Sequence, residues 1–514
     1  MGRNIDIVCY MIWLIVALVC LSFLELAIGY IKRSLSQKVL AYVLVLAVSP
    51  ISLAIIIISP ALWSGLIVYL SMYRVVNLFK LIDGRKELDY LRTSFVRSAI
   101  SLGVYQLVVI ILMILARLIN LDYSNGLVAL DFLILAGLFI IVSSISRGLV
   151  KTRPKLSSEN LDYSKLPTLS VALPARNETV NLEECLASIV ASDYPKMEVL
   201  VLDDCSQLKR TPEIIRKFAH DGVIFLEGKE PNESWTAKNY AYEQLAQEAN
   251  GEIIMFSGVD VRFQAQTIRR MVELKLAKKK KMVSFMPLNG LMVSGFKRLL
   301  IQPVRYLWEI GLPRRFINRP PVLSTCWLID KKALDSAGSF KAVSRSIEPE
   351  RYFARRTLDS NDGYSFICLG RELGLTSDKS FSEQFDTAIR TRYPILRQRL
   401  EHVSVVVLAE LSLFVLSIGM IVYGLIIASW LLVVISLINM ILASVISYII
   451  TNLTYSNGPL LSLLIYPIAV IYNVWLLLDS MFKYEFSEVV WKGRNVCIPI
   501  MQVKPSLPKL DPEQ

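Results

Sequence analysis

Histidine is almost absent from this chain of 514 residues, which contains only His220 and His402. Imidazole is the commonest transition-metal ligand in proteins and the proton acceptor of the Ser-His-Asp triad. With only two histidines, the chain argues against a histidine-based metal centre and against a hydrolytic triad of that kind.

Cysteine pairs are also missing. The seven cysteines are scattered and no two of them form a C-x-x-C motif. Cys9 and Cys20 lie in apolar runs, where a thiol behaves as a small hydrophobic group. The cysteine pattern therefore predicts neither a disulfide framework nor a zinc site.

Charge is the third shortage. Charged residues make up 19% of the chain and hydrophobic residues 54%, a balance too apolar for an ordinary soluble protein. The formal net charge is nevertheless +12. In a membrane protein such an excess is typical of cytoplasmic loops and of contact with anionic lipid. We therefore expect the membrane as a partner, and no nucleic acid.

Long apolar runs account for the composition. Residues 1–149 are predicted to form five transmembrane helices, and residues 401–480 three more that are transmembrane or re-entrant. No small-residue cleavage site follows the first run, so we expect a retained helix. The predicted spans are 7–29, 38–59, 61–79, 98–118, 126–146, 404–428, 430–451 and 458–479.

The loop charges predict an orientation. Basic clusters follow the first, third and fifth spans, whereas the loops at 59–60 and 119–125 contain no Lys or Arg. The positive-inside rule then places the amino terminus outside and everything from about residue 147 in the cytoplasm. For the tail, 481–514, the signals conflict. Three further spans would place it outside, whereas its Lys and Arg favour the inside. Either one of the three segments is re-entrant or interfacial, or the tail breaks the rule.

Between the apolar regions the chain is polar. Residues 150–168 resemble a linker, and strands alternate with helices from 169 onward. This alternation predicts an α/β domain, 169–400, with a mostly parallel sheet. An amphipathic stretch near 295–316 is compatible with interfacial helices and equally with a helix in the core of the domain.

The opening of this domain combines a strand, a turn, a helix and a second strand. Pro174, Asn177 and Glu178 belong to the turn, and Asp203 and Asp204 end the second strand. Loops at the carboxyl ends of strands converge on the ligand site of open α/β sheets. Paired acids there can bind a ribose or a base, or help to hold a cation. A helix cap followed by a solvated acid is the simpler alternative.

Residues 169–206 resemble the opening of inverting family 2 glycosyltransferases, which read P-A-x-N-E, a helix and then V-D-D-x-S. The resemblance is closest to the membrane-bound branch that includes hopanoid-associated and carotenoid glycosyltransferases. It implies a GT-A type, Rossmann-like domain in the cytoplasm, flanked by transmembrane helices. The other matching motifs are W-T-A-K at 235–238, G-V-D-V-R-F at 258–263, R-L-L-I-Q-P at 298–303 and W-K-G-R at 491–494.

The resemblance implies roles for these residues. A divalent cation, Mg²⁺ or Mn²⁺, would neutralise the diphosphate of a nucleotide-sugar donor, with Asp260 as the metal ligand. Gly258 replaces the first Asp of the family's D-x-D motif, which weakens the case for ordinary metal-dependent binding. Lys238 would meet phosphate, unless it is a surface lysine. The implied donor contacts are Pro174, Asn177, Glu178, Asp203, Asp204 and Lys238.

The catalytic base of inverting members is the Asp of an E-D pair ahead of a helix. Counting back from Ala354-Arg355 places Glu350 at that position and Pro349 where the Glu would be. Glu348 is the second candidate. The alternative is that both are helix-start acids favoured by the helix dipole.

We therefore expect a hexosyltransferase that moves a sugar with inversion to a lipid-linked, polyprenyl-type or other membrane-embedded acceptor. The absent Q-x-x-R-W signature argues against the rival interpretation as a processive polysaccharide synthase. Gly258 and Pro349 keep open a second rival, a catalytically silent relative that acts as a membrane scaffold.

Overall fold

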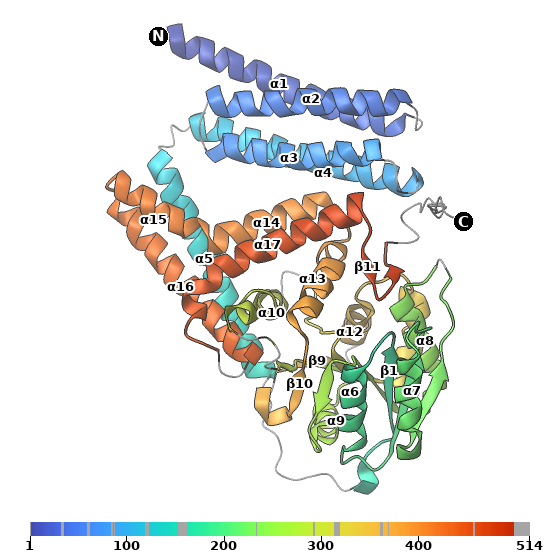
Figure 1. The fold of residues 1–514 in the computed structure, drawn as a ribbon. Helices are drawn as coiled ribbons and strands as arrows, with labels where there is room; N and C mark the ends of the chain where they lie inside the picture. Colours follow the sequence, from blue (N-terminus) through green and yellow to red (C-terminus); the bar gives the residue numbers. More distant parts are fainter. Residues whose placement is uncertain are drawn as a thin grey trace, which may run out of the picture. The chain divides into compact units, whose positions relative to one another are not determined.

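The chain folds into two compact units. The first comprises residues 1–129, 389–410 and 477–514, and the second comprises 130–388 and 411–476. We describe each by itself (Figure 1). The computed structural model describes residues 2–31, 35–58, 62–83, 86, 88–118, 123–152, 163–232, 234–290, 293, 295–312, 319–359, 363–368, 370–455 and 458–497.

The first unit is built on four long helices that pack as α1 on α2, α2 on α3, and α4 on both α3 and α1. Their apolar side chains form its core, for example Leu21, Leu44, Leu78 and Phe95, each less than 9% exposed. The helices are α1 (Gly2–Tyr30), α2 (Leu35–Ile58), α3 (Leu62–Asp83) and α4 (Leu88–Leu118).

A cluster of polar side chains is buried between these apolar helices. Arg74 of α3 is fully buried, and its Nε donates to Glu25 of α1 at 3.0 Å. Its NH1 group donates to the amide oxygen of Gln106 on α4 at 2.6 Å. Because a charge in an apolar interior is costly without a partner, this pairing ties α1, α3 and α4 together.

A hairpin near the carboxyl end completes the described part of the first unit. It joins β11 (Val490–Trp491) to β12 (Arg494–Asn495) through Lys492 and Gly493. Both turn residues have positive φ, 47° and 80°, as a tight hairpin turn requires. The guanidinium of Arg390 lies 4.5 Å from the Trp491 ring centroid. The W-K-G-R motif therefore packs on the basic segment around Arg390 within the first unit.

The second unit contains a seven-stranded sheet in the order β3-β2-β1-β4-β8-β6-β9. Only β8 runs antiparallel to its neighbours, so the sheet is mostly parallel. The strands are β1 (Leu169–Ala175), β2 (Met197–Asp203), β3 (Val223–Glu227), β4 (Ile253–Ser257), β6 (Met282–Phe285), β8 (Cys326–Asp330) and β9 (Tyr364–Ile367).

Alternating side chains divide the core into two layers. Val171 and Met255 join one layer, and Ala172 and Phe256 join the other. Because successive side chains of a strand point to opposite faces, both faces of an apolar strand can be covered. Helices α6 (Val180–Val190), α7 (Arg210–Lys217) and α9 (Thr267–Ala277) cover the first face, and α8 (Ala237–Glu248), α11 (Lys331–Ser336) and α12 (Pro349–Asp359) the second.

A small second sheet positions one end of the site. Its order is β5 (Val261–Phe263), β10 (Leu375–Ser377) and β7 (Leu288–Asn289). Strands β5 and β10 are antiparallel, with Ser377 opposite Val261. Short 3₁₀ turns and one further helix complete the domain: η1 (Tyr163–Lys165), η2 (Ala219–Asp221), η3 (Gly295–Leu299), η4 (Phe340–Val343), η5 (Gly370–Leu373) and α13 (Phe381–Ile395).

Apolar helices accompany the α/β domain in the second unit. They are the larger part of α5 (Tyr123–Thr152), α15 (Leu416–Ile426), α16 (Trp430–Tyr455) and the first part of α17 (Ser462–Phe486). Within the described residues, seven helices are long and apolar enough to cross a membrane, or eight if the bent pair of α14 (Leu400–Phe414) and α15 forms one span. These long apolar helices suggest a multi-pass membrane protein.

Several predicted boundaries shift. Helix α5 continues to Thr152, so the predicted linker at 150–168 begins inside a helix, and 153–162 lie outside the described residues. The predicted span at 404–428 is two helices that meet at an angle of 52°. In the amphipathic stretch, α10 (Gln302–Ile310) packs on α16 through buried side chains such as Leu307, and 313–318 are outside the described residues.

Candidate active site

Several predicted donor contacts and the predicted metal ligand share one edge of the large sheet. Strands β2, β1 and β4 are adjacent and parallel, so their carboxyl ends lie side by side. Pro174 is the last residue but one of β1 and lies opposite Leu202 of β2. Asp203 is the last residue of β2, and Asp260 follows β4. The sheet topology thus brings these residues, spread over some ninety positions of sequence, to a single edge.

Asn177 connects two of the loops at this edge. It has a positive φ of 49°, and its side-chain oxygen accepts hydrogen bonds from the backbone N–H groups of Gln207, at 2.8 Å, and Leu208, at 3.2 Å. Its own N–H donates to the Ser206 hydroxyl at 2.9 Å. Asn177 therefore fixes the loop after β1 to the loop after β2, a positioning role that the sequence did not reveal.

Arg176 reinforces the same connection. Its NH1 group donates to the backbone oxygens of Asp204, at 2.6 Å, and Cys205, at 2.8 Å. The neighbouring Asp203 accepts a hydrogen bond from the Ser206 N–H at 3.3 Å. Asp204 is 4% exposed and Asp203 half-buried, so Asp203 is the more accessible carboxylate of the pair. Arg176 belongs to the P-A-x-N-E turn but was not predicted as a site residue.

Asp260 is held by one side chain from the end of β10 and one from the segment that follows it. The Ser377 hydroxyl donates to its Oδ2 at 2.6 Å, and the Lys379 ammonium lies 3.5 Å from the same oxygen. Burial raises the pKa of Asp260, but Lys379 and Ser377 outweigh it, so the pKa lies below its usual range. Asp260 is therefore ionised and paired with a cation of the chain itself.

The donor set around Asp260 does not fit a divalent cation. Mg²⁺ and Mn²⁺ prefer several oxygen ligands, usually including carboxylates. The first carboxylate of the family motif is replaced by Gly258, and a Cβ at this position would lie 2.6 Å from Asp260 Oδ1. In the described residues, no group of three Asp, Glu, His or Cys side chains is arranged to hold a metal. We derive no step through a cation.

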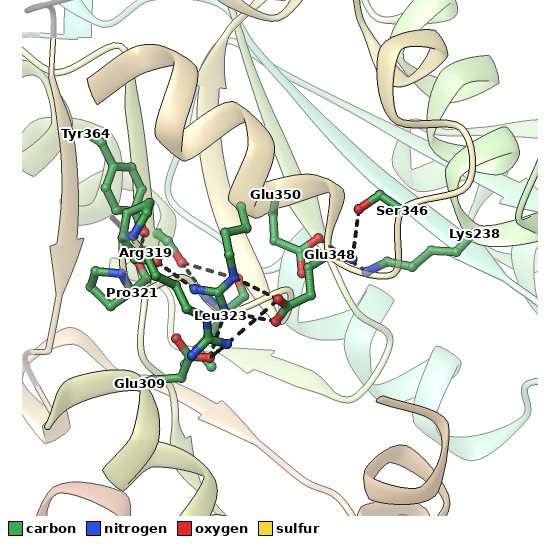
Figure 2. A network of polar contacts seen from close by, with 12 residues as sticks. Lys238, Glu309, Arg319, Pro321, Leu323, Ser346, Glu348, Glu350 and Tyr364 are labelled. Atoms are coloured by element: carbon green, nitrogen blue, oxygen red, sulfur yellow. Dashed lines mark hydrogen bonds and ion pairs between the residues drawn. The ribbon is translucent and has the colours of Figure 1, made fainter. Parts of the chain in front are cut away.

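Glu350 occupies the other part of the site. Helix α12 begins at Pro349, where a missing N–H and a fixed φ suit a first helical position, and Glu350 is its second residue. The Glu350 side chain is 3% exposed, and its Oε2 accepts no hydrogen bond from the described residues. The Lys238 ammonium lies 3.6 Å from that oxygen (Figure 2). Burial raises the pKa of Glu350, Lys238 lowers it and Glu348 raises it, with a net increase.

Glu348 has the opposite surroundings. Arg351 donates to both of its oxygens, at 2.7 and 2.9 Å, and Arg319 lies 3.8 Å away. These charges outweigh burial and hold the pKa of Glu348 below its usual range. Arg351 also donates to Glu309 at 2.8 Å and to the Pro320 backbone oxygen at 2.7 Å. Figure 2 shows Glu309 and Arg319 on the side of Glu348 that faces away from Lys238.

Tyr242 lies one helical turn after Lys238 on α8. The Lys238 ammonium is 5.5 Å from its ring centroid. Burial raises the pKa of Tyr242, and the negative charges of Glu350 and then Asp260 raise it further. The α/β domain thus brings the candidate base Glu350 of α12 next to Lys238 of α8.

Comparison with known proteins identifies the family of the central part of the chain. Residues 170–338 match the sequence family described as glycosyl transferase family 2. This stretch contains the edge formed by β1, β2 and β4 and the D-x-D position. Residues 170–338 form a family 2 glycosyltransferase domain. Its mostly parallel sheet is of the GT-A type.

Two curated relatives align with part of the chain. Glycosyltransferase AglE of Haloferax volcanii is 37% identical over 111 residues, which are 21% of this chain and 35% of that protein. Probable glycosyltransferase YdaM of Bacillus subtilis is 32% identical over 103 residues, 19% of this chain and 24% of that protein. The chain thus spans about a third and a quarter of these relatives. They support the family, and they do not support the hopanoid or carotenoid branch.

Two solved structures align with much of the chain at low sequence identity and low TM-score. The mannosyltransferase PcManGT of Pyrobaculum calidifontis, solved with GDP-Man and Mn²⁺, is 17% identical, with a TM-score of 0.40 over 70% of this chain and 98% of that chain. S. aureus TarS 1–349, solved with UDP, is 13% identical, with a TM-score of 0.31 over 64% and 95%.

Proposed function

We propose that the chain is an inverting glycosyltransferase of the membrane, which transfers a sugar from a nucleotide-sugar donor to a lipid-linked or membrane-embedded acceptor. The match of residues 170–338 to the family supports the reaction class. The long apolar helices support a membrane-borne acceptor. Following the loop charges, the family 2 domain would face the cytoplasm.

The state of Glu350 is the observation that carries the proposal. Inversion requires a base that removes the acceptor proton as the hydroxyl attacks the anomeric carbon. Glu350 has a buried carboxyl oxygen without a hydrogen-bond donor and a raised pKa, which make it a good proton acceptor once ionised. Glu348 is engaged by two arginines and has a lowered pKa, so it is the weaker base.

The reaction then balances as a single displacement. The acceptor oxygen forms a bond to the anomeric carbon while its proton moves to Glu350 Oε2. The bond from that carbon to the diphosphate breaks, and its electron pair stays on the phosphate oxygen. Lys238 pairs with Glu350 and is 33% exposed, so movement of its side chain is the simplest way for an acceptor to reach the base.

The sheet edge formed by the carboxyl ends of β1 and β2 is proposed to bind the nucleoside of the donor. Glu178 and Asp203 provide carboxylates that can accept hydrogen bonds from ribose hydroxyls, and Pro174 and Asn177 hold the turn in which Glu178 lies. The backbone oxygen of Glu178 accepts a hydrogen bond from Thr211 at 2.8 Å, which fixes the turn from its other side. Asp204 is buried, so it supports the edge from within.

A transfer screen on membranes tests the function. Membranes with the parent chain, incubated with radiolabelled nucleotide sugars, should form a labelled lipid product. Glu350→Gln keeps the shape and removes the base, so the rate should fall by roughly 10²–10⁴-fold while nucleotide binding persists. Glu213→Gln, an exposed acid of α7 with an exposed partner, is the matched control and should keep the parent rate.

Two outcomes would contradict the assignment. If Glu348→Gln loses far more activity than Glu350→Gln, the base is Glu348. If the parent chain labels no lipid from any donor and binds no nucleotide, the family 2 domain is not acting as a transferase.

A further inference from the structure

We propose that the ammonium of Lys379, and not a divalent cation, neutralises the diphosphate of the donor, so that this domain binds its nucleotide sugar without a metal. The proposal rests on the transferase function proposed above and names the group that replaces the cation.

The first step is the space around Asp260. Its Oδ1 lies where a side chain at position 258 would begin, since an ideal Cβ there would be 2.6 Å away. Non-bonded carbon and oxygen atoms do not approach that closely. Glycine at 258 therefore does more than remove a carboxylate. It allows Asp260 to turn toward the backbone of its own motif, an orientation that a second acid would block.

The second step is the partner that Asp260 has taken. Its Oδ2 accepts from the Ser377 hydroxyl at 2.6 Å and lies 3.5 Å from the Lys379 ammonium. The side chain of Lys379 is 20% exposed and that of Asp260 is 14% exposed. The ammonium thus stands at the strand-end carboxylate of the motif, with part of its surface open to a ligand.

The third step is the rigidity of this placement. The backbone N–H of Asp378 donates to the Asp260 backbone oxygen at 2.8 Å, extending the pairing of β10 with β5. Directly after Lys379, Ser380 and Glu383 form a reciprocal capping box. The Ser380 N–H donates to Glu383 at 2.8 Å, and the Glu383 N–H donates to the Ser380 hydroxyl at 3.3 Å. Lys379 is therefore fixed between a strand and a helix start.

The fourth step is the chemistry. As the bond between sugar and diphosphate breaks, negative charge grows on the leaving phosphate oxygen. A positioned ammonium can stabilise that charge by a charge-assisted hydrogen bond, as a cation would by coordination. Asp260 then orients Lys379 through their ion pair and acts as a positioning residue.

Nucleotide binding without catalysis tests the proposal. The purified full-length chain in lipid nanodiscs is titrated calorimetrically with UDP and with GDP, in excess EDTA and again with Mn²⁺. At least one nucleotide should bind the parent, with the same affinity in both buffers. Lys379→Met keeps most of the length of the side chain and removes its charge. It should weaken that nucleotide by roughly 10- to 100-fold in EDTA.

Two further variants control for folding and for charge. Lys379→Arg keeps the positive charge and should retain most of the affinity. Lys341→Met removes an exposed lysine of η4 and should bind as the parent does. The proposal is wrong if EDTA abolishes nucleotide binding to the parent while Lys379→Met binds normally in Mn²⁺. In that case a cation neutralises the diphosphate. If neither nucleotide binds in either buffer, the transferase function itself fails.

Discussion

Glu348 and Glu350 carry the same carboxyl group two residues apart, yet their surroundings act on it in opposite directions. Arg351 and Arg319 stabilise the ionised form of Glu348. Burial destabilises the ionised form of Glu350, and Lys238 only partly offsets that effect. The pKa of Glu350 is therefore raised and that of Glu348 lowered, and the pH dependence of the transfer rate can test this difference.

We expect Lys238→Met to move the acid limb of the pH–rate profile to higher pH. The transferase needs ionised Glu350, so its rate falls as pH drops through the pKa of Glu350. The positive charge of Lys238 lowers that pKa, and removing the charge must raise it. The measurement is the initial transfer rate as a function of pH, with Lys341→Met as the control variant.

Glu348→Gln should move the same limb the other way. The negative charge of Glu348 raises the pKa of Glu350, so its removal lowers that pKa and extends activity to lower pH. Shifts of the same sign in Lys238→Met and Glu348→Gln would show that the limb does not report Glu350.

The sequence predicted the candidate base better than it predicted the base's partners. Glu350 and Glu348 were found from their spacing to Ala354-Arg355. What separates them are contacts with Arg319, Glu309 and Lys238, which lie far away in sequence and meet only in the fold. Lys379 was missed for the same reason, because the sequence of 377–379 carries no motif and Ser377 lies 117 residues from Asp260.

Among the elements, α13 matters most for the proposed donor site, because its first turn follows Lys379 immediately. Ser380→Ala removes one half of the capping box and should cost about 1 kcal/mol of local stability. We expect faster hydrogen exchange of the first α13 amides, measured by mass spectrometry, together with weaker nucleotide binding in EDTA. Lys341→Met, at an exposed residue of η4 outside this helix start, is the control.

If Ser380→Ala speeds exchange but leaves nucleotide binding unchanged, the start of α13 does not position the donor-binding lysine.

The opening β1–α6–β2 unit was accessible from sequence, because apolar runs of period two and a helical stripe are local signals. The pairing of β10 with β5 was not, because strands of three residues carry too little pattern to predict a partner.

For the whole molecule, the bent pair α14–α15 bears on the side of the membrane on which the tail lies. Helix α14 has 15 residues, roughly 22 Å at the usual rise, which is shorter than a hydrocarbon core of about 30 Å. If the pair enters and leaves on one side, the remaining seven helices place the tail on the side of the family 2 domain. That arrangement agrees with the positive charges of Lys483, Lys492 and Arg494.

We therefore predict that a membrane-impermeant thiol reagent added to intact cells labels a cysteine placed at Asn125 and misses cysteines placed at Ser158 and Ser487. The parent chain gives the background from native cysteines. Labelling at Ser158 but not at Asn125 would reverse the orientation. Labelling at Asn125 and Ser487 together would show that α14–α15 crosses the membrane.

The buried pair of Arg74 and Glu25 also has a consequence for biogenesis. Helix α3 carries Arg74 and is the least apolar of the candidate spans, with a mean hydropathy of 1.4 against 2.5 for α1. An unpaired arginine at the centre of a nascent helix opposes its release from the translocon into lipid. Because α1 is synthesised first, it can remain next to the translocon until α3 emerges, and Glu25 can then pair with Arg74. The insertion of α3 would then depend on a helix made two segments earlier.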